Sequence, residues 1–264
     1  MPDPNQEDEL AGTEQPFVAH LVELRDRLIK AMIAVGVVAG VLFLYPGPAS
    51  LYDILAAPLV AHLPKGATLI ATSVISPFLV PLKILLMSAF LIALPVVLYQ
   101  VWAFVAPGLY SHEKRMVMPL VVSSTLLFFV GVAFCYFFVF GQVFSFIQKF
   151  APKSITAAPD IEAYLSFVMT MFIAFGLAFE VPIVVVVLAR MGFVSIDKLK
   201  KSRGYFIVVA FIVAAVITPP DVVSQLALAL PMCLLYETGI WAAQLFIKKT
   251  QSPEEQPAAA DGSH

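Results

Sequence analysis

The stretch that decides the fold class is YLSFVMTMFIAFGLAFEVPIVVVVLAR, residues 164–190. Between Tyr164 and Arg190 it holds one ionisable side chain, Glu180, and Pro182 follows two positions later. A helix of around 20 apolar residues is long enough to cross about 30 Å of hydrocarbon. The stretch therefore predicts a membrane-spanning helix that carries one acid near its middle and a proline beside it.

The composition of the whole chain agrees with a membrane protein. Hydrophobic residues make up 60% and charged residues 13% of the 264 residues, whereas an ordinary soluble domain has about 25% charged residues. The mean hydropathy is +0.91. The net charge is −2, and no basic cluster is interleaved with aromatic residues, which argues against a nucleic-acid partner. The lipid bilayer is the expected surrounding of this chain.

Six stretches are apolar enough to span a membrane. Peptide groups in lipid must be satisfied internally, and the stretches lack the alternation of a β-barrel, so we expect an all-α membrane protein. The fifth stretch has room for about 15 residues, roughly 22 Å of helix. It is joined to the sixth by ITPPD, so we expect the last two helices to be short. The six predicted spans are 28–45, 77–101, 116–140, 164–190, 204–217 and 222–247.

Basic residues in the connections predict the orientation, because they are enriched on the cytoplasmic side. Most of them lie on one side if both termini are cytoplasmic (N-in/C-in), with Lys65, Lys149 and Lys153 outside. Lys83 lies inside the second predicted helix, and we expect its side chain to snorkel to the interface. Residues 1–16 and 250–264 are expected to be disordered cytoplasmic tails, and 17–249 to form one transmembrane domain.

The two outer connections are long enough to act as periplasmic caps. In the first, residues 46–77, leucine and isoleucine recur at nearly helical spacing. We expect an amphipathic helix on the membrane surface that is broken at Pro58. The second connection, residues 148–164, is also substantial.

The sequence argues against an enzyme. No histidine lies in a helix centre, no two aspartates face each other at membrane depth, and no phosphate-binding loop is present. The two cysteines, Cys135 and Cys233, lie far apart in apolar segments, so we expect no disulfide, metal or cofactor.

Two acidic positions near the cytoplasmic side leave two interpretations open. Glu23 with Arg27, and Asp26 with Lys30, are spaced as surface ion pairs on one helix. The loop YQVWAFVAPGLYSHEKR (99–115) is dense in aromatic residues and contains Glu113, which also suits the first turn of a helix. Alternatively, Glu23 and Glu113 form one interface whose carboxylates accept hydrogen bonds from arginine side chains.

Five segments of the chain resemble the TatC family of the twin-arginine protein translocase. They occur in the family's order between about residues 17 and 247. The segments are HLVELRDRL (20–28), ATSVISPF (71–78), YQVWAFVAPGLYSHEKR (99–115), IEAYLSFVMTMFIAFGLAFEVP (161–182) and TPPDVVSQ (218–225).

The resemblance implies a function. It implies a Sec-independent translocase subunit of the bacterial inner membrane that binds twin-arginine signal peptides of folded cargo at its cytoplasmic face. With single-span TatA- and TatB-type subunits, such a protein moves cargo by the proton-motive force, and it self-associates in a multimeric receptor complex. The residues implied in signal-peptide binding are Glu23, Arg25, Leu28, Phe104 and Glu113. Those implied as intramembrane polar contacts to partner helices are Glu180, Thr218 and Gln225. Pro58, Pro95 and Asp221 match structural or partner-contact positions.

The sequence leaves more than one role open for Glu180. A charge at the centre of an isolated helix costs about 3 kcal/mol or more, so we expect the group to be neutral, paired or wetted. It serves as a docking point for a partner helix, or as a protonated carboxyl bonded to the carbonyl that Pro182 frees. A small-molecule transporter would use it as a proton or substrate site with Gln225 and Glu237. A purely structural scaffold would not depend on the cytoplasmic carboxylates.

Overall fold

The computed structural model describes residues 4–60, 69–105, 117–150, 160–218 and 221–250. These residues are almost entirely helical, so the predicted all-α class is confirmed. Five helical segments are long and apolar enough to cross a membrane, and a shorter apolar helix covers Arg203–Ile217. The chain divides into two compact units, Met1–Gly176 and Leu177–His264. The five long spans are Val18–Leu44, Ser76–Val105, Val117–Phe146, Ile161–Arg190 and Val222–Leu245.

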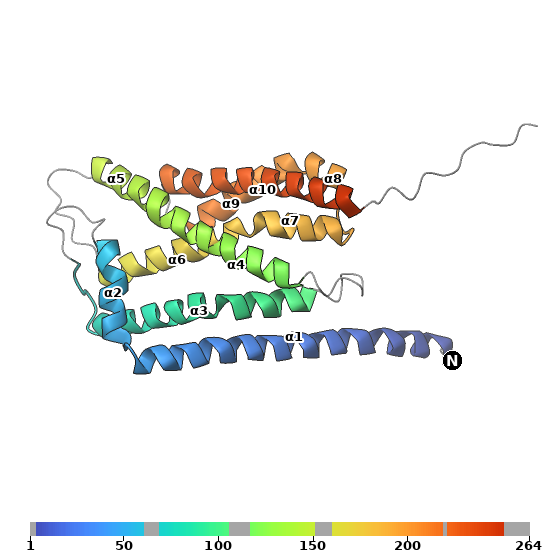
Figure 1. Ribbon diagram of the computed structural model, residues 1–264, viewed down its shortest axis with the longest axis horizontal. Coiled ribbons are helices and arrows are strands. Elements are labelled where there is room, and N and C mark those ends of the chain that lie inside the picture. The colour runs from blue at the N-terminus through green and yellow to red at the C-terminus, as the bar shows by residue number, and fades with distance from the viewer. Residues whose placement is uncertain (1–3, 61–68, 106–116, 151–159, 219–220, 251–264) are drawn as a thin grey trace, which may run out of the picture. The chain divides into compact units, whose positions relative to one another are not determined.

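The first unit begins with α1 (Pro4–Leu44), α2 (Pro48–Val60) and α3 (Ser76–Val105). Figure 1 shows α1 and α3 side by side, with α2 crossing one end of the pair and packing on α3. The turn from α1 into α2 passes through Gly47, whose φ is 89°. A side chain is strained in this left-handed conformation, so glycine suits the position. Leu51 of α2 is buried, whereas Ile54 is exposed.

Two of the predicted helix limits in this unit differ from the structure. Helix α1 begins at Pro4, so residues 4–16 are helical where we expected a disordered tail. Proline is well tolerated in the first turn of a helix, because its missing N–H has no helical partner there. The break expected at Pro58 is wrong, because α2 continues through it to Val60. Pro58 lies in the last turn, so the helix extends only two residues beyond it and little helix depends on the hydrogen bond that it removes.

The rest of the first unit is a long helix that packs on α6 through aromatic side chains. Its segments are α4 (Val117–Phe134), a π-helical turn η3 (Cys135–Val139) and α5 (Phe140–Phe150), and α6 covers Ile161–Phe179. The Phe128 ring is fully buried, and it lies directly against Gly176 of α6. A Cβ at position 176 would come within 2.4 Å of the ring. This glycine therefore allows the two helices to approach closely.

The chain is not one continuous helix at Glu180, as Pro182 predicts. Helix α6 ends at Phe179 and α7 covers Val181–Arg190. The Glu180 amide donates to the Leu177 carbonyl at 3.1 Å, and the Glu180 carbonyl accepts from Ile183 and Val184 at 3.0 Å. Because Pro182 has no N–H to donate to residue 178, the helix restarts with the proline in its first turn. The expected loosening beside Pro182 is confirmed.

The second unit packs α7 against α10 (Val222–Thr250), with α8 (Ile196–Lys201) and α9 (Arg203–Ile217) beside them. Its core contains Val185, Leu199 and Tyr236. The Tyr236 hydroxyl donates to the Leu199 carbonyl at 2.9 Å, and the Tyr236 ring stacks on Phe206 at 4.0 Å. These contacts join α10 to both α8 and α9.

The expectation that both of the last two helices are short is wrong for the sixth. Helix α10 has 29 residues, and Pro231 lies inside it without ending it. Only α9, with 15 residues, is short. A proline in a membrane helix is tolerated where neighbouring groups satisfy the freed carbonyl.

The segments that directly precede α3 and α6 are bonded to each other in the first unit. Ile70 pairs with Asp160 as an isolated parallel bridge, and the Ile161 amide donates to the Ile70 carbonyl at 2.8 Å. One Asp160 oxygen accepts from the amide and hydroxyl of Thr72 at 3.0 and 2.6 Å. The other accepts the Glu162 and Ala163 amides at 3.0 Å, which caps α6. The hydrogen bond from Thr72 is the main cause that lowers the pKa of Asp160 to about 2.

We predict that Gly239→Ala destabilises the second unit. A Cβ at position 239 would lie 2.9 Å from the Pro182 Cα and 3.0 Å from the Val185 Cβ. Because one of these atoms is backbone, the helices must move apart, at a cost of about 1–3 kcal/mol. The midpoint of thermal unfolding in detergent should fall. Gly204→Ala is the matched control, since a Cβ there meets nothing within 4 Å; equal midpoints for the two variants would contradict the prediction.

We predict that Asp160→Asn loosens the tie between Thr72 and α6. The folded-state pKa lies below the ordinary value of 3.8. The carboxylate therefore contributes stability that is fully present above pH 3.8 and is lost as the pH falls through about 2. At neutral pH the Thr72 amide should exchange hydrogen faster in the variant, and the difference from wild type should shrink toward pH 2. Asp53→Asn in α2 is the control, and it should leave exchange at Thr72 unchanged.

Candidate functional site

Glu23 lies in α1, where its carboxylate already holds a guanidinium group. Arg27 donates from Nε and Nη2 to Oε1 of Glu23 at 2.9 and 2.6 Å. The second oxygen, Oε2, lies 4.0 Å from Nδ1 of His20. The Glu23 side chain is 34% exposed, so it remains accessible beside its two neighbours. The predicted pair of Glu23 with Arg27 is confirmed.

His20 connects Glu23 to the end of α3. Its ring stacks on Phe104 with the centroids 4.3 Å apart and the planes 18° apart. Phe104 is the next-to-last residue of α3. His20 thus brings together Glu23 and Phe104, two residues that the resemblance implies in one site. We call His20, Glu23, Arg27 and Phe104 the Glu23 cluster. The sequence analysis did not assign His20 to the site, although its spacing of three residues from Glu23 places both on one side of α1.

Two other residues implied in the site lie elsewhere around α1. Arg25 donates to Asp26 at 2.9 and 2.8 Å, and both side chains are exposed. Asp26 therefore forms its ion pair with Arg25, whereas the sequence spacing predicted an ion pair with Lys30. Leu28 is 57% exposed. At about 100° of rotation per residue, positions 25 and 28 face away from Glu23.

Glu113 lies outside the described residues, as do 106–116 as a whole. Residues 99–105, which the sequence analysis placed in an aromatic loop, are the last turns of α3. Trp102 is buried there, and its Nε1 donates to the Ser124 hydroxyl of α4 at 2.8 Å. This aromatic residue therefore joins two helices, because a buried indole N–H needs a partner.

Glu180 is buried, with 7% of its surface exposed. It is the N-cap residue of α7, in a helical conformation with φ −74° and ψ −16°. Arg190 at the far end of α7 lies ten residues on, or roughly 15 Å along a helix. The break between α6 and α7 therefore places one carboxyl group near the middle of a predicted membrane span, away from both ends.

The polar residues at the junction of α9 and α10 bond within the chain. The Thr218 hydroxyl donates to the Ala214 carbonyl at 2.8 Å at the end of α9, and Thr218 is buried. Nε2 of Gln225 donates to the Phe211 carbonyl at 3.3 Å, which joins α10 to α9. Asp221 caps α10 by accepting the Ser224 amide at 2.7 Å. The junction is thus held by three of the residues that the resemblance selects.

Three further residues named in the sequence analysis, Pro58, Pro95 and Glu237, lie within helices. Pro95 lies inside α3, and Pro58 lies in α2. Glu237, which a transporter would use together with Glu180, accepts from Arg203 of α9 at 2.7 and 2.8 Å. Among the residues that the structure describes, no three His, Cys, Asp or Glu side chains gather as metal ligands would.

Lys83 forms an ion pair with a residue of α6. Its Nζ donates to Oε1 of Glu162 at 2.5 Å, and the other oxygen of Glu162 accepts from the Ser76 hydroxyl at 2.7 Å. Glu162 is the second residue of α6. This ion pair joins α3 to the first turn of α6. The snorkelling of Lys83 to the interface stays a prediction.

Comparison with known proteins identifies the family. A family model described as "Sec-independent protein translocase protein (TatC)" matches residues 19–231. The "Sec-independent protein translocase protein TatC" of Escherichia coli (strain K12) is 47% identical over 241 residues, which cover 91% of this chain and 93% of that protein. The protein of the same name from Halothiobacillus neapolitanus is 49% identical over 250 residues, which cover 93% of this chain and 68% of the relative.

Solved structures agree with the sequence relatives. A structure described as "Crystal Structure of Twin Arginine Translocase Receptor- TatC" has a TM-score of 0.73 and 41% identity, and the match covers 86% of this chain and 98% of that one. A second structure of the receptor, in DDM, has a TM-score of 0.74 over 85% of this chain. This chain belongs to the TatC family, a multi-pass membrane component of the Sec-independent (twin-arginine) protein translocase.

Proposed function

We propose that this protein is the receptor subunit that binds twin-arginine signal peptides of folded cargo through Glu23 and Glu113. Both termini would be cytoplasmic, in the inner membrane of a bacterium. The observation that carries the proposal is the Glu23 cluster, where a partly exposed carboxylate holds a guanidinium group beside an aromatic residue of another helix. A carboxylate in this setting has the chemistry needed to bind a second arginine.

The bond between Arg27 and Glu23 supports exchange with an incoming arginine. Nε and Nη2 of Arg27 both donate to the same oxygen, Oε1. The other oxygen, Oε2, lies 4.0 Å from Nδ1 of His20, and the Glu23 side chain as a whole is 34% exposed. An ion pair of this spacing on a helix contributes only about 0.3–0.5 kcal/mol. An arginine of a signal peptide can therefore share the Glu23 carboxylate with Arg27, or displace Arg27 from it, at little cost in free energy.

Arginine is favoured over lysine by the geometry of the group. A guanidinium presents a planar fork of donors, whereas an ammonium is a compact point charge. Phe104 and the stacked His20 ring add an aromatic surface, on which a guanidinium packs well. We propose that Glu113, carried on the segment that follows α3, provides the second carboxylate, with Arg25 and Leu28 bordering the path of the peptide.

The same proposal assigns Glu180 to partner recognition. A buried carboxyl group near the middle of a membrane span is a strong hydrogen-bonding group in a medium with few partners. Glu180, Thr218 and Gln225 would contact the single helices of TatA- and TatB-type subunits. Assembly of these subunits, and of further copies of this chain, would form the passage for folded cargo, driven by the proton-motive force.

We predict that Glu113→Ala and Glu23→Ala both weaken signal-peptide binding. Loss of a hydrogen bond to a charged group costs about 1.5–3 kcal/mol, so the larger effect should be tenfold or more. Glu113→Ala should have the larger effect, because Glu23 already shares its carboxylate with Arg27. Binding of a fluorescent twin-arginine peptide to the purified protein in detergent measures both.

The control is Asp53→Ala, which removes an exposed carboxylate of α2, outside the Glu23 cluster. It should bind the peptide as wild type does. A twin-lysine peptide should bind weakly to every variant. Wild-type affinity and normal export of a twin-arginine reporter by the Glu23→Ala, Glu113→Ala double variant would refute the proposal.

We predict that Glu180→Ala separates partner contact from cargo recognition. Photocrosslinks between α7 and the transmembrane helix of a TatA- or TatB-type subunit should fall several-fold, because the buried hydrogen-bonding group is lost. Signal-peptide affinity should stay near the wild-type value, since Glu23 belongs to the other compact unit. The opposite pattern, with intact partner crosslinks and lost peptide binding, would overturn the assignment. Glu237→Ala tests whether any acid in this unit has the same effect.

A further inference from the structure

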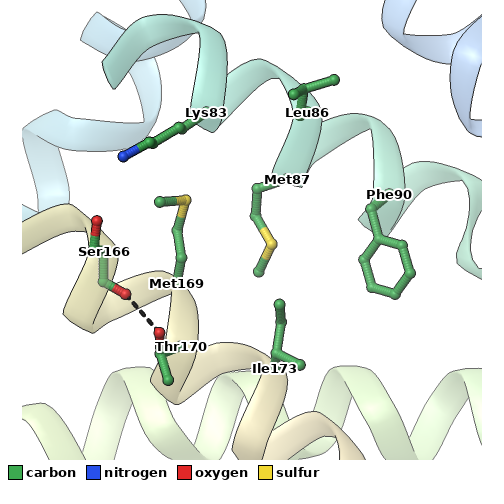
Figure 2. A pocket seen from close by; sticks show the side chains of 8 residues that line it. All are labelled: Lys83, Leu86, Met87, Phe90, Ser166, Met169, Thr170 and Ile173. Carbon is green, nitrogen blue, oxygen red and sulfur yellow. Dashed lines mark hydrogen bonds between the residues drawn. The ribbon is translucent and has the colours of Figure 1, made fainter. Parts of the chain in front are cut away.

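An open groove with a volume of about 480 Å³ lies between α3 and α6 in the first unit. Its lining is mostly apolar, with one charged residue at one end. Figure 2 shows Lys83 and Ser166 toward one side, Phe90 toward the other, and the two methionine side chains between them. The residues that matter here are Lys83, Met87, Phe90, Ser166, Met169 and Ile173.

The residues that line the groove lie on one face of α3 and one face of α6, and they extend away from the end at Lys83. Lys83, Met87 and Phe90 are spaced four and three residues apart on α3, which is the spacing of a single helical face. Ser166 and Ile173 are separated by the same seven residues on α6. Seven residues correspond to roughly 10 Å of helix. The groove therefore runs along both helices from a polar end to an apolar end.

The polar end keeps hydrogen-bonding capacity. Lys83 bonds to Glu162 through Nζ, and a lysine ammonium has three N–H donors. Both oxygens of Glu162 are engaged, by Lys83 and by the Ser76 hydroxyl. Within the part of the chain that the structure describes, Glu162 is the hydrogen-bond partner of Lys83, and the Lys83 side chain remains 40% exposed. Its other donors are available to an acceptor at the mouth of the groove.

We propose that the groove binds a membrane phospholipid. The phosphodiester accepts hydrogen bonds from Nζ of Lys83, and one acyl chain lies over Met87 and Met169 toward Phe90 and Ile173. Methionine is flexible and adapts to an irregular apolar ligand. The groove is open along two membrane-spanning segments, and the surrounding bilayer supplies phospholipid at high local concentration.

The chemistry of the groove favours a lipid over the helix of another protein. Helix contacts within membranes use small residues that let the backbones approach closely. Ser166 and Thr170 are small, but the rest of this surface is built from larger side chains, among them Lys83, Phe90 and two methionines. Because Glu162 balances the charge of Lys83, the site has no net positive charge. A zwitterionic phospholipid therefore suffices, and an anionic headgroup gains little.

Photolabelling tests the proposal on the full chain reconstituted in phosphatidylcholine vesicles. One probe is a photoactivatable phosphatidylcholine, and the other is a diacylglycerol with the same photoactivatable chain but no phosphate. The phospholipid should label peptides of α3 and α6 about fivefold more than the diacylglycerol, as one charge-assisted hydrogen bond allows. Unlabelled phosphatidylglycerol should compete no better than unlabelled phosphatidylcholine.

Two variants test the two ends of the groove. Lys83→Met should make the two probes label equally, and Thr170→Trp, at an exposed position of the lining, should reduce labelling by both probes. Lys149→Met and Ile92→Trp are the matched controls, because both positions are exposed and lie outside the lining. Both controls should label as wild type does.

Three results would overturn the proposal. The first is equal labelling of the wild type by both probes, and the second is a preference for phosphatidylcholine that survives both Lys83→Met and Thr170→Trp. The third is capture of a protein, with no lipid adduct, by a photoreactive residue at position 170 in native membranes. A tenfold advantage of phosphatidylglycerol as competitor would overturn the inference that the site is electrically balanced.

Discussion

A peptide group within a bilayer has no water to bond, so the chain must satisfy its own N–H and C=O groups. This constraint explains why the described residues are nearly all helical. Pro182 occupies the first turn of α7, where its missing N–H would have no helical partner in any case. The break that this requires places Glu180 between two helices, and its carbonyl starts the new one.

The second constraint is that charge is costly at low dielectric, and the chain meets it by pairing. Lys83 with Glu162 joins α3 to α6, and Arg203 with Glu237 joins α9 to α10. These pairs connect different helices, so they help fix the packing within each unit. The pair of Arg27 with Glu23 lies within one helix, so breaking it releases no helix contact. This difference supports a role for Glu23 in binding and a structural role for the other pairs.

Sequence patterns predicted the fold class and the short fifth helix, because length and hydropathy are local properties. Six spans were predicted, and the structure has five helices long and apolar enough to cross a membrane besides the shorter α9. They also predicted the disturbance at Pro182, which depends on the missing N–H alone. The predicted helix limits were less accurate at Pro4 and Pro58, since a proline near a helix end costs little. The predicted ends of the sixth span agree with α10, but the expectation that this helix is short was wrong. Of the predicted binding residues, the structure joins Glu23 to Phe104 but places Arg25 and Leu28 on other sides of α1.

The sequence by itself determined where the long apolar helices lie and which charged groups they carry, because these follow from composition and spacing. Only the tertiary structure decided which groups meet. Lys83 and Glu162 are far apart in the chain, and so are His20 and Phe104, yet each pair is in contact. Gly239 and Pro182 show the same principle, since the close approach of α7 and α10 is set by packing. Helix formation depends on neighbours along the chain, whereas a site depends on the relative position and rotation of packed helices, which no single segment specifies.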